Sequence, residues 1–225
     1  MMTRISPRLP AAATRRTMLG GLGGLLALSA CELPGGGDPP RLYTLSPKST
    51  FDPDLPKVPW QLTVETPIAE ASLDTTRIAV QRTPVTVDYY ARSAWTDRAP
   101  ALVQTLLIQS FENTGKIVAV GRESVGLRAD YTLKLELRQF EALQPASTPP
   151  DVRVRLNAKL VRTETRAIIA DFTAENIVKA ESGEMQAIVL TFDDALGKTL
   201  RRIVEWTLRA PAAAEPQRPG GRRMG

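Results

Sequence analysis

The sequence of 225 residues contains no histidine. Histidine is the usual base that activates a serine or cysteine nucleophile, and it is the commonest ligand of transition metals. The sequence also contains neither a GxSxG nor an SxxK motif, which mark serine nucleophiles in known enzymes. Asp193 and Asp194 are adjacent, and neighbouring side chains on a helix do not face each other, so they cannot share a proton as a catalytic pair. We therefore expect a protein that is not an enzyme and that holds no cofactor and no metal.

Cysteine occurs only once, at position 31. A single cysteine cannot form an internal disulfide, a CxxC redox pair or a zinc site. A lone cysteine is often a buried free thiol, but Cys31 follows an apolar run and precedes a Pro/Gly-rich stretch that offers no core. The preceding residues, Leu28-Ser29-Ala30, complete the pattern of a bacterial lipobox, whose small residues admit the peptidase and whose thiol takes up a diacylglycerol. Cys31 is therefore predicted to be lipidated and to anchor the mature chain to a membrane.

Residues 1–30 have the features of an export signal that is removed. The segment carries four arginines and no acidic residue, and its apolar run over residues 18–30 is shorter than the roughly 20 residues that span a bilayer. The segment from Thr14 to Leu19 resembles a twin-arginine signal. Because Met18 replaces the usual aromatic residue, twin-arginine export and general secretion both remain open.

The residue after the predicted lipidation site bears on the choice of membrane. Glu32 follows Cys31, whereas Asp at this position is the familiar signal for retention in the inner membrane. We therefore expect a periplasmic lipoprotein sorted to the outer membrane. Anchoring in the inner membrane remains the alternative, because this rule varies among bacteria.

The positive charge of the whole chain belongs mostly to its ends. All four charged residues of the leader are arginines, so the formal net charge falls from +5 for the whole chain to +1 for residues 31–225. It is −1 for residues 31–210. Binding of nucleic acid requires a basic face on the folded domain itself, and the composition therefore predicts no nucleic-acid partner.

Proline and glycine mark the expected boundaries of one domain. Residues 31–59 are expected to form the lipidated, flexible Pro/Gly-rich tether, with a short strand over residues 41–45. Residues 60–209 are long enough for a single domain with its own core. Residues 210–225, rich in Ala, Pro, Gly and Arg, are expected to be a disordered tail.

Two periodicities occur within this domain. Apolar and polar residues alternate in three segments and predict half-buried strands, and shorter strands are expected elsewhere; the ranges are 131–138, 152–160 and 168–174, then 61–65, 77–82, 85–90 and 117–120. Apolar residues three and four apart predict helices over residues 100–115, capped by Thr96 or Asp97 and stopped by Gly115, and over residues 183–208. We therefore predict an α+β fold, with a mostly antiparallel or mixed sheet and two main amphipathic helices packed on one face.

The first candidate group for partner binding gathers aromatic residues. Tyr89, Tyr90, Arg92 and Trp95 fall between the early strands and the first helix, in a predicted loop. Aromatic side chains in a loop can form a recognition edge, and packing of one or two of them in the core is the alternative.

The second candidate group is basic. Arg153 and Arg155 lie, with Lys159, on the polar side of an alternating strand. They would face an acidic partner or anionic lipid headgroups. The alternative is an ordinary wet face of a sheet, with Glu136 on a neighbouring strand as the ion-pair partner.

The order and spacing of these segments resemble the ABC-type transport auxiliary lipoproteins, which are encoded beside MCE-type lipid transporters. The resemblance covers roughly residues 28–208. It rests on the lipobox, on the final amphipathic helix, and on five short segments between them: Leu42-Tyr43-Thr44-Leu45, Arg77-Ile78-Ala79-Val80, residues 87–100, Ala129-Asp130-Tyr131-Thr132-Leu133 and Val152-Arg153-Val154-Arg155-Leu156.

The resemblance implies a non-catalytic periplasmic component of an ABC transporter that moves phospholipid or another hydrophobic substrate. Its expected partners are an MCE-family substrate-binding protein and the ABC permease and ATPase, to which it would dock or form a bridge. The alternative function is a periplasmic lipid carrier that holds an acyl chain between helices and sheet. Formation of a homo-oligomer is left open.

Overall fold

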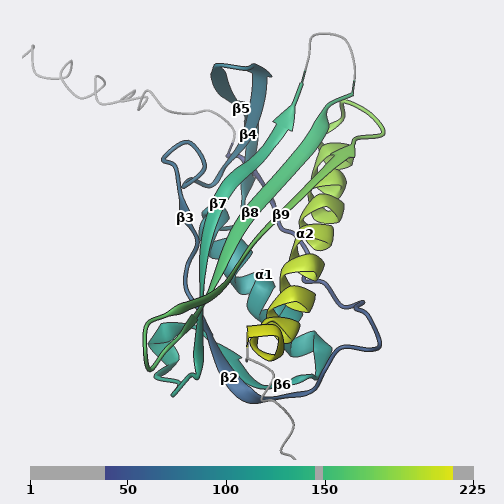
Figure 1. Ribbon diagram of the computed structural model, residues 1–225. Helices are drawn as coiled ribbons and strands as arrows, with labels where there is room; N and C mark the ends of the chain where they lie inside the picture. The colour runs from purple at the N-terminus through teal and green to yellow at the C-terminus, as the bar shows by residue number, and fades with distance from the viewer. Residues whose placement is uncertain (1–38, 145–148, 215–225) are drawn as a thin grey trace, which may run out of the picture. The chain divides into compact units, whose positions relative to one another are not determined.

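A computed structural model describes residues 39–144 and 149–214 (Figure 1). The predicted leader and Cys31 lie outside the described residues. Nine strands and two α-helices follow one another: β1 Arg41–Tyr43, β2 Val58–Val64, β3 Ile68–Ala69, β4 Arg77–Thr83, β5 Thr86–Trp95, α1 Ala99–Thr114, β6 Ile117–Gly121, β7 Tyr131–Leu143, β8 Asp151–Arg162, β9 Ile168–Lys179 and α2 Met185–Ala214. A single 3₁₀ turn, Glu123–Val125, lies between β6 and β7.

Strand β7 organises the sheet. On one side it pairs along its whole length with β8 in antiparallel register, from Tyr131 opposite Arg162 to Leu143 opposite Asp151. On the other side three strands share it in parallel register: β2 at its start, β3 in its middle and β4 at its end. Beyond them β6 pairs with β2, β5 with β4, and β1 with β5. The sheet is therefore mixed, which confirms the predicted α+β fold.

The two ends of β7 carry different neighbours. Strands β2 and β6 lie beside its start, and the β4–β5 hairpin extends from its end, at the bottom and the top of Figure 1 respectively. A strand rises about 3.3 Å per residue, and β4 pairs with β7 ten residues beyond β2, so these neighbours lie about 33 Å apart along β7, with the hairpin turn further still.

Both helices pack against the sheet and against each other. Apolar residues of β8 that alternate along the strand, such as Leu156 and Leu160, are fully buried beneath α2, whose Phe192 and Leu200 are also fully buried. Helix α1 ends where predicted, because Gly115 adopts φ 61°, a left-handed conformation that glycine accepts without strain. Its expected side-chain cap is absent: Arg98 occupies the N-cap position and no side chain there bonds the first turn.

The domain begins earlier than the expected boundary at residue 60. Leu45 and Leu55 are buried in the core, and backbone amides of this segment bond helix side chains: Ser46 N donates to Asp193 Oδ1 (2.6 Å) and Lys48 N to Ser110 Oγ (2.9 Å). Residues 45–57 thus pack across α1 and α2, with one turn at residues 53–54, and do not form a free tether. The predicted short strand is present as β1, whereas the prediction of a flexible tether is wrong for residues 45–59.

Helix α2 also extends further than predicted. It continues through Pro211 to Ala214, so the first five residues of the expected disordered tail are helical. Leu208, Ala210 and Pro211 are buried, and this packing, with the high helix propensity of the following alanines, outweighs the helix-breaking effect of proline.

Candidate functional site

The predicted aromatic loop is part of strand β5. Trp95, its last residue, is 1% exposed and packs against Phe140 of β7 and Phe192 of α2, with ring centroids 5.5 and 5.1 Å away. The prediction of Trp95 as a surface recognition residue is therefore wrong, and the alternative of core packing holds for it, because β7 and α2 enclose its ring.

Tyr89 and Tyr90 are half-buried and have partners within the domain. The Tyr89 hydroxyl donates to the carbonyl oxygen of Ser72 (3.1 Å), and the Arg77 guanidinium lies 3.6 Å from the centre of the Tyr89 ring. Tyr90 lies near the Gln144 side chain, and burial raises the pKa of its phenol. These contacts fix both rings against the domain.

Arg92 is the exposed member of this group. The register of β4 and β5 passes from Ala79 opposite Tyr89 to Arg77 opposite Ala94, so residues 90–93 bulge out opposite one residue of β4. Arg92 sits in this bulge with φ 52°, a conformation that costs a non-glycine residue free energy. Its side chain is thereby presented to solvent at the edge of the sheet. Partner binding through Tyr89, Tyr90 and Arg92 stays a prediction.

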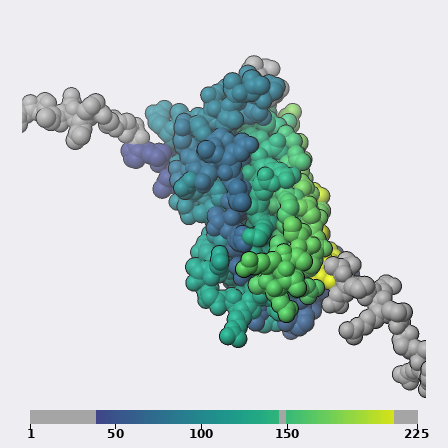
Figure 2. All heavy atoms as spheres, turned by 60° about the vertical axis from the view of Figure 1, so that its left-hand side comes forward, coloured from purple at the N-terminus to yellow at the C-terminus, as the bar shows by residue number. Residues whose placement is uncertain are grey.

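The β4–β5 hairpin projects beyond this bulge and forms the uppermost part of Figure 2 that is drawn in colour. Val85, in its turn, is 90% exposed, and Val87 on β5 is 45% exposed. Thr83 and Thr86 close the turn through a 2.7 Å hydrogen bond between their hydroxyls. Apolar side chains in a fixed, protruding turn form a contact feature that the alternation pattern of the sequence did not distinguish from an ordinary strand.

Arg153 and Arg155 lie on the face of the sheet opposite the helices. Arg153 Nε bonds Glu175 Oε1 on β9 (2.7 Å), and Arg155 Nε lies 3.8 Å from the other carboxylate oxygen of Glu175. The expected partner of the basic strand was Glu136, which instead pairs with Arg138 on its own strand (2.7 Å). The prediction of an ion-paired wet face thus had the wrong partner, because the strand register places Glu175 of β9 opposite Arg155, whereas Glu136 of β7 lies opposite Asn157. A role of the two arginines in partner binding stays a prediction.

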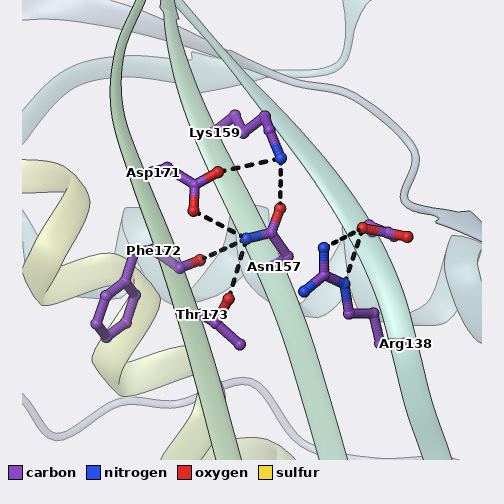
Figure 3. A network of polar contacts seen from close by, with 7 residues as sticks. Arg138, Asn157, Lys159, Asp171, Phe172 and Thr173 are labelled. Carbon is purple, nitrogen blue, oxygen red and sulfur yellow. Dashed lines mark hydrogen bonds and ion pairs between the residues drawn. The ribbon is translucent and has the colours of Figure 1, made fainter.

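Figure 3 shows a network of polar contacts around Asn157 on this face. The Asn157 amide nitrogen lies within hydrogen-bonding distance of Asp171, the Phe172 carbonyl and Thr173, at 3.0 to 3.3 Å. Lys159 bridges Asn157 (2.8 Å) and Asp171 (3.0 Å), and its hydrogen bond lowers the pKa of the Asp171 carboxyl. These side chains hold β8 and β9 together.

The opposite end of the domain carries a second exposed apolar region, which the sequence analysis did not single out. We call it the β6 surface: Val118, 63% exposed, Val125, 70% exposed, and the half-buried Ile108 and Val120. A groove of about 440 Å³ runs between α1 and the turn after β6, lined by Ile108, Val120 and Val125 among others. In the described residues β6 pairs with β2 alone, so its outer edge is unpaired.

A second groove lies at the same end. It has a volume of about 450 Å³ and is lined by Trp60, Tyr131 and Arg162, with residues 127–130 on its other side. Trp60 and Tyr131 meet edge to face at 5.2 Å, and the Arg162 guanidinium lies 5.5 Å from the Tyr131 ring. Both grooves are open to solvent.

Two further observations concern the part of the chain that the structure describes. Within residues 39–144 and 149–214, no helix combines the length and apolar character needed to cross a membrane. Over the same ranges, no three His, Cys, Asp or Glu side chains gather as metal ligands would. The predicted lipidation at Cys31 lies outside these ranges.

Known proteins similar to this chain point to one family. The family model described as the ABC-type transport auxiliary lipoprotein component matches residues 43–204. The crystal structure of a Xanthomonas campestris protein, of family DUF330, superposes with a TM-score of 0.73 at 30% identity and covers 77% of this chain and 97% of its own. Another solved structure, of an uncharacterised protein, has a TM-score of 0.59 at 12% identity over 74% of this chain and 97% of its own, which shows likeness of fold alone.

A curated relative is longer. A protein of Bradyrhizobium diazoefficiens is 31% identical over 196 residues, which are 85% of this chain and 51% of that protein, so the chain spans about half its length. The resemblance inferred from the order of the sequence segments is confirmed, and the chain belongs to the family of ABC-type transport auxiliary lipoprotein components.

Proposed function

We propose that this protein is a periplasmic, membrane-anchored auxiliary component of an MCE-type lipid transport system and that it acts by docking, without catalysis. The match of the family model over residues 43–204 carries the proposal, because it extends from the end of β1 through most of α2. The lipobox before Cys31 supports anchoring by lipid, and Glu32 supports sorting to the outer membrane.

Docking requires a surface that a protein partner can cover. The β6 surface has the required features: an unpaired strand edge, which a partner strand can extend by backbone hydrogen bonds, and exposed valines beside a groove. The basic face of β8 is less suited, because its charges are already paired with β9. We therefore assign contact with the transporter to the β6 surface.

The packing of the core supports docking over the alternative of a lipid carrier. A carrier would hold an acyl chain between helices and sheet. In the described residues that space is filled by side chains with no exposed surface, including Leu156, Phe192 and Ile203, and close-packed cores leave few voids larger than a water molecule. Native purification followed by lipid mass spectrometry tests the carrier directly: stoichiometric bound lipid would favour it.

Capture from solubilised envelope tests docking. The lipidated full chain should retain an MCE protein or the ABC permease, and Val118→Lys should abolish this retention, because a lysine on an edge strand opposes further strand pairing. Ile177→Lys is the matched control, since Ile177 is similarly exposed but lies on β9. Repeated failure of the lipidated wild-type chain to retain either protein would contradict the transporter assignment. Equal retention by both variants would contradict only the choice of surface.

A further inference from the structure

The direction of β1 determines from which side the anchored chain reaches the domain. β1 is parallel to β5, with Arg41 opposite Ser93 and Tyr43 opposite Trp95. The chain that leads into Arg41 therefore arrives from the side of lower-numbered β5 residues, where Thr86 and the hairpin turn lie. In Figure 1 this hairpin and the start of the described chain lie in the same half of the domain.

The length of the connecting chain limits the distance from Arg41 to the membrane. Ten residues lead from Cys31 to Arg41, a contour length of about 35 Å at full extension. From the level of Arg77, next to the start of β1, strand β4 rises to the hairpin turn over six residues, or about 20 Å. This projection is shorter than the contour length of the ten residues, so the hairpin turn and the Cys31 lipid can reach one membrane surface.

The chemistry of the hairpin fits a lipid surface. Its most exposed side chain, Val85, is apolar and stands in a turn closed by the Thr83–Thr86 hydrogen bond. Near the turn Arg82 lies 3.5 Å from Asp88, the single acidic residue of residues 77–95. An exposed apolar side chain beside a basic one is typical of segments that enter the interface of anionic membranes.

We infer that the β4–β5 hairpin rests on the membrane that holds the Cys31 lipid, with Val85 entering the headgroup region and Arg82 facing lipid phosphates. The contact is confined to the hairpin, because Asp151, Glu181 and Glu184 outnumber Lys179 at the β8–α2 side of the same end and disfavour anionic lipid there. The inference rests on the lipidation of Cys31 that is part of the proposed function.

This orientation has a consequence for docking. The β6 surface lies beside the start of β7 and the hairpin beside its end, so a hairpin on the membrane holds the β6 surface more than about 33 Å away. The domain would then present its docking surface to the interior of the periplasm and would itself act as the spacer.

Fluorophores at single positions test this orientation. Lipidation blocks the Cys31 thiol as a thioether, so Val85→Cys introduces one free thiol that an environment-sensitive NBD label can take. The lipidated full chain, reconstituted into vesicles of phosphatidylethanolamine and phosphatidylglycerol, should show a severalfold rise in emission and a blue shift for a label at position 85. The control, Val118→Cys labelled in the same way, should keep the emission of the label in water.

Three outcomes distinguish the possibilities. An aqueous spectrum at position 85 in vesicle-bound protein would overturn the inference, and a blue shift at position 118 alone would place the other end on the membrane. Intact-mass measurement shows first whether the diacylglycerol is present. Its absence would contradict the proposed anchoring itself, and the protein would then not be held on the vesicles at all.

Discussion

Trp95 and Phe192 meet edge to face, with ring centroids 5.1 Å apart and ring planes at 78°. Trp95 ends strand β5 and Phe192 lies in helix α2, and Phe140 of β7 contacts both rings. This aromatic cluster joins the hairpin-bearing edge of the sheet to the helical layer. It therefore fixes the position of the hairpin relative to the rest of the domain.

Removal of the Trp95 side chain should destabilise the domain. Trp95→Ala leaves a cavity between β5, β7 and α2, and large-to-small changes of this kind cost about 3–5 kcal/mol. Urea unfolding followed by circular dichroism measures the loss. Val85→Ala, at the exposed hairpin turn, is the control and should change the free energy of unfolding by less than about 0.5 kcal/mol. Equal stability of the two variants would contradict the packing described for Trp95.

Asn157 should contribute more to the free energy of unfolding than the charged side chain of Arg153. Asn157 is buried, and Asn157→Ala removes the donor that Phe172 and Thr173 share, while Asp171 keeps Lys159 as a donor. Loss of such partly buried bonds costs about 1–2 kcal/mol, whereas Arg153→Ala breaks a partly exposed ion pair worth up to about 1 kcal/mol. Unfolding at low and high salt separates the two, because only the Arg153 effect should weaken with added salt. A larger loss for Arg153→Ala would contradict this ranking.

Glu141 should make the domain less stable as the pH rises. Burial raises the pKa of the Glu141 carboxyl, against the hydrogen bond that its carboxylate accepts from Phe140 N (2.9 Å). The folded state therefore binds this proton more tightly than the unfolded state, so its contribution is present below the ordinary glutamate pKa and is lost between that value and the raised one. Glu141→Gln keeps an oxygen acceptor for Phe140 and should reduce this pH dependence in urea unfolding. An unchanged slope would contradict the assignment.

Replacement of Cys31 should release a folded domain. Cys31→Ala removes the thiol that takes up lipid, while the core begins only near Leu45. The variant should move from the membrane fraction to the soluble periplasmic fraction with an unchanged circular dichroism spectrum. Continued recovery with membranes would show that another part of the chain provides the attachment.

Local patterns along the chain predicted most of the regular elements, but not β3 or the second half of β5. The alternation of Leu133, Leu135 and Leu137 with polar residues, and the glycine at 115, predicted β7 and the end of α1, because strand alternation and the left-handed helix stop depend on neighbours in sequence. The prediction placed the start of the folded domain too late, at residue 60. Prolines at 47, 53 and 56 exclude a regular helix or strand, but they do not indicate whether the chain packs against the domain or is a free tether.

The candidate surfaces depend on contacts between segments that are distant in sequence. Trp95 is buried because β7 and α2 close over it, and Arg153 pairs with Glu175 because β9 folds back beside β8. The spacing of residues along the chain does not indicate either of these contacts. The predictions for Arg92 and Trp95 rested on the same seven residues. The bulge in β5 exposes Arg92, whereas Trp95, beyond the bulge, faces the core.

The sequence by itself indicated the family, because the order of its segments is that of the auxiliary lipoproteins, and it predicted lipidation at Cys31 from the lipobox. Both depend on short motifs or on their order, which are visible without a fold. Only the tertiary structure decided which side chains remain available to a partner. The parallel pairing of β1 with β5 and the sharing of β7 by β2 and β4 set the hairpin and the β6 surface at opposite ends of one strand. The reason is that strand pairing is chosen by packing across the whole core and not by the residues within each strand.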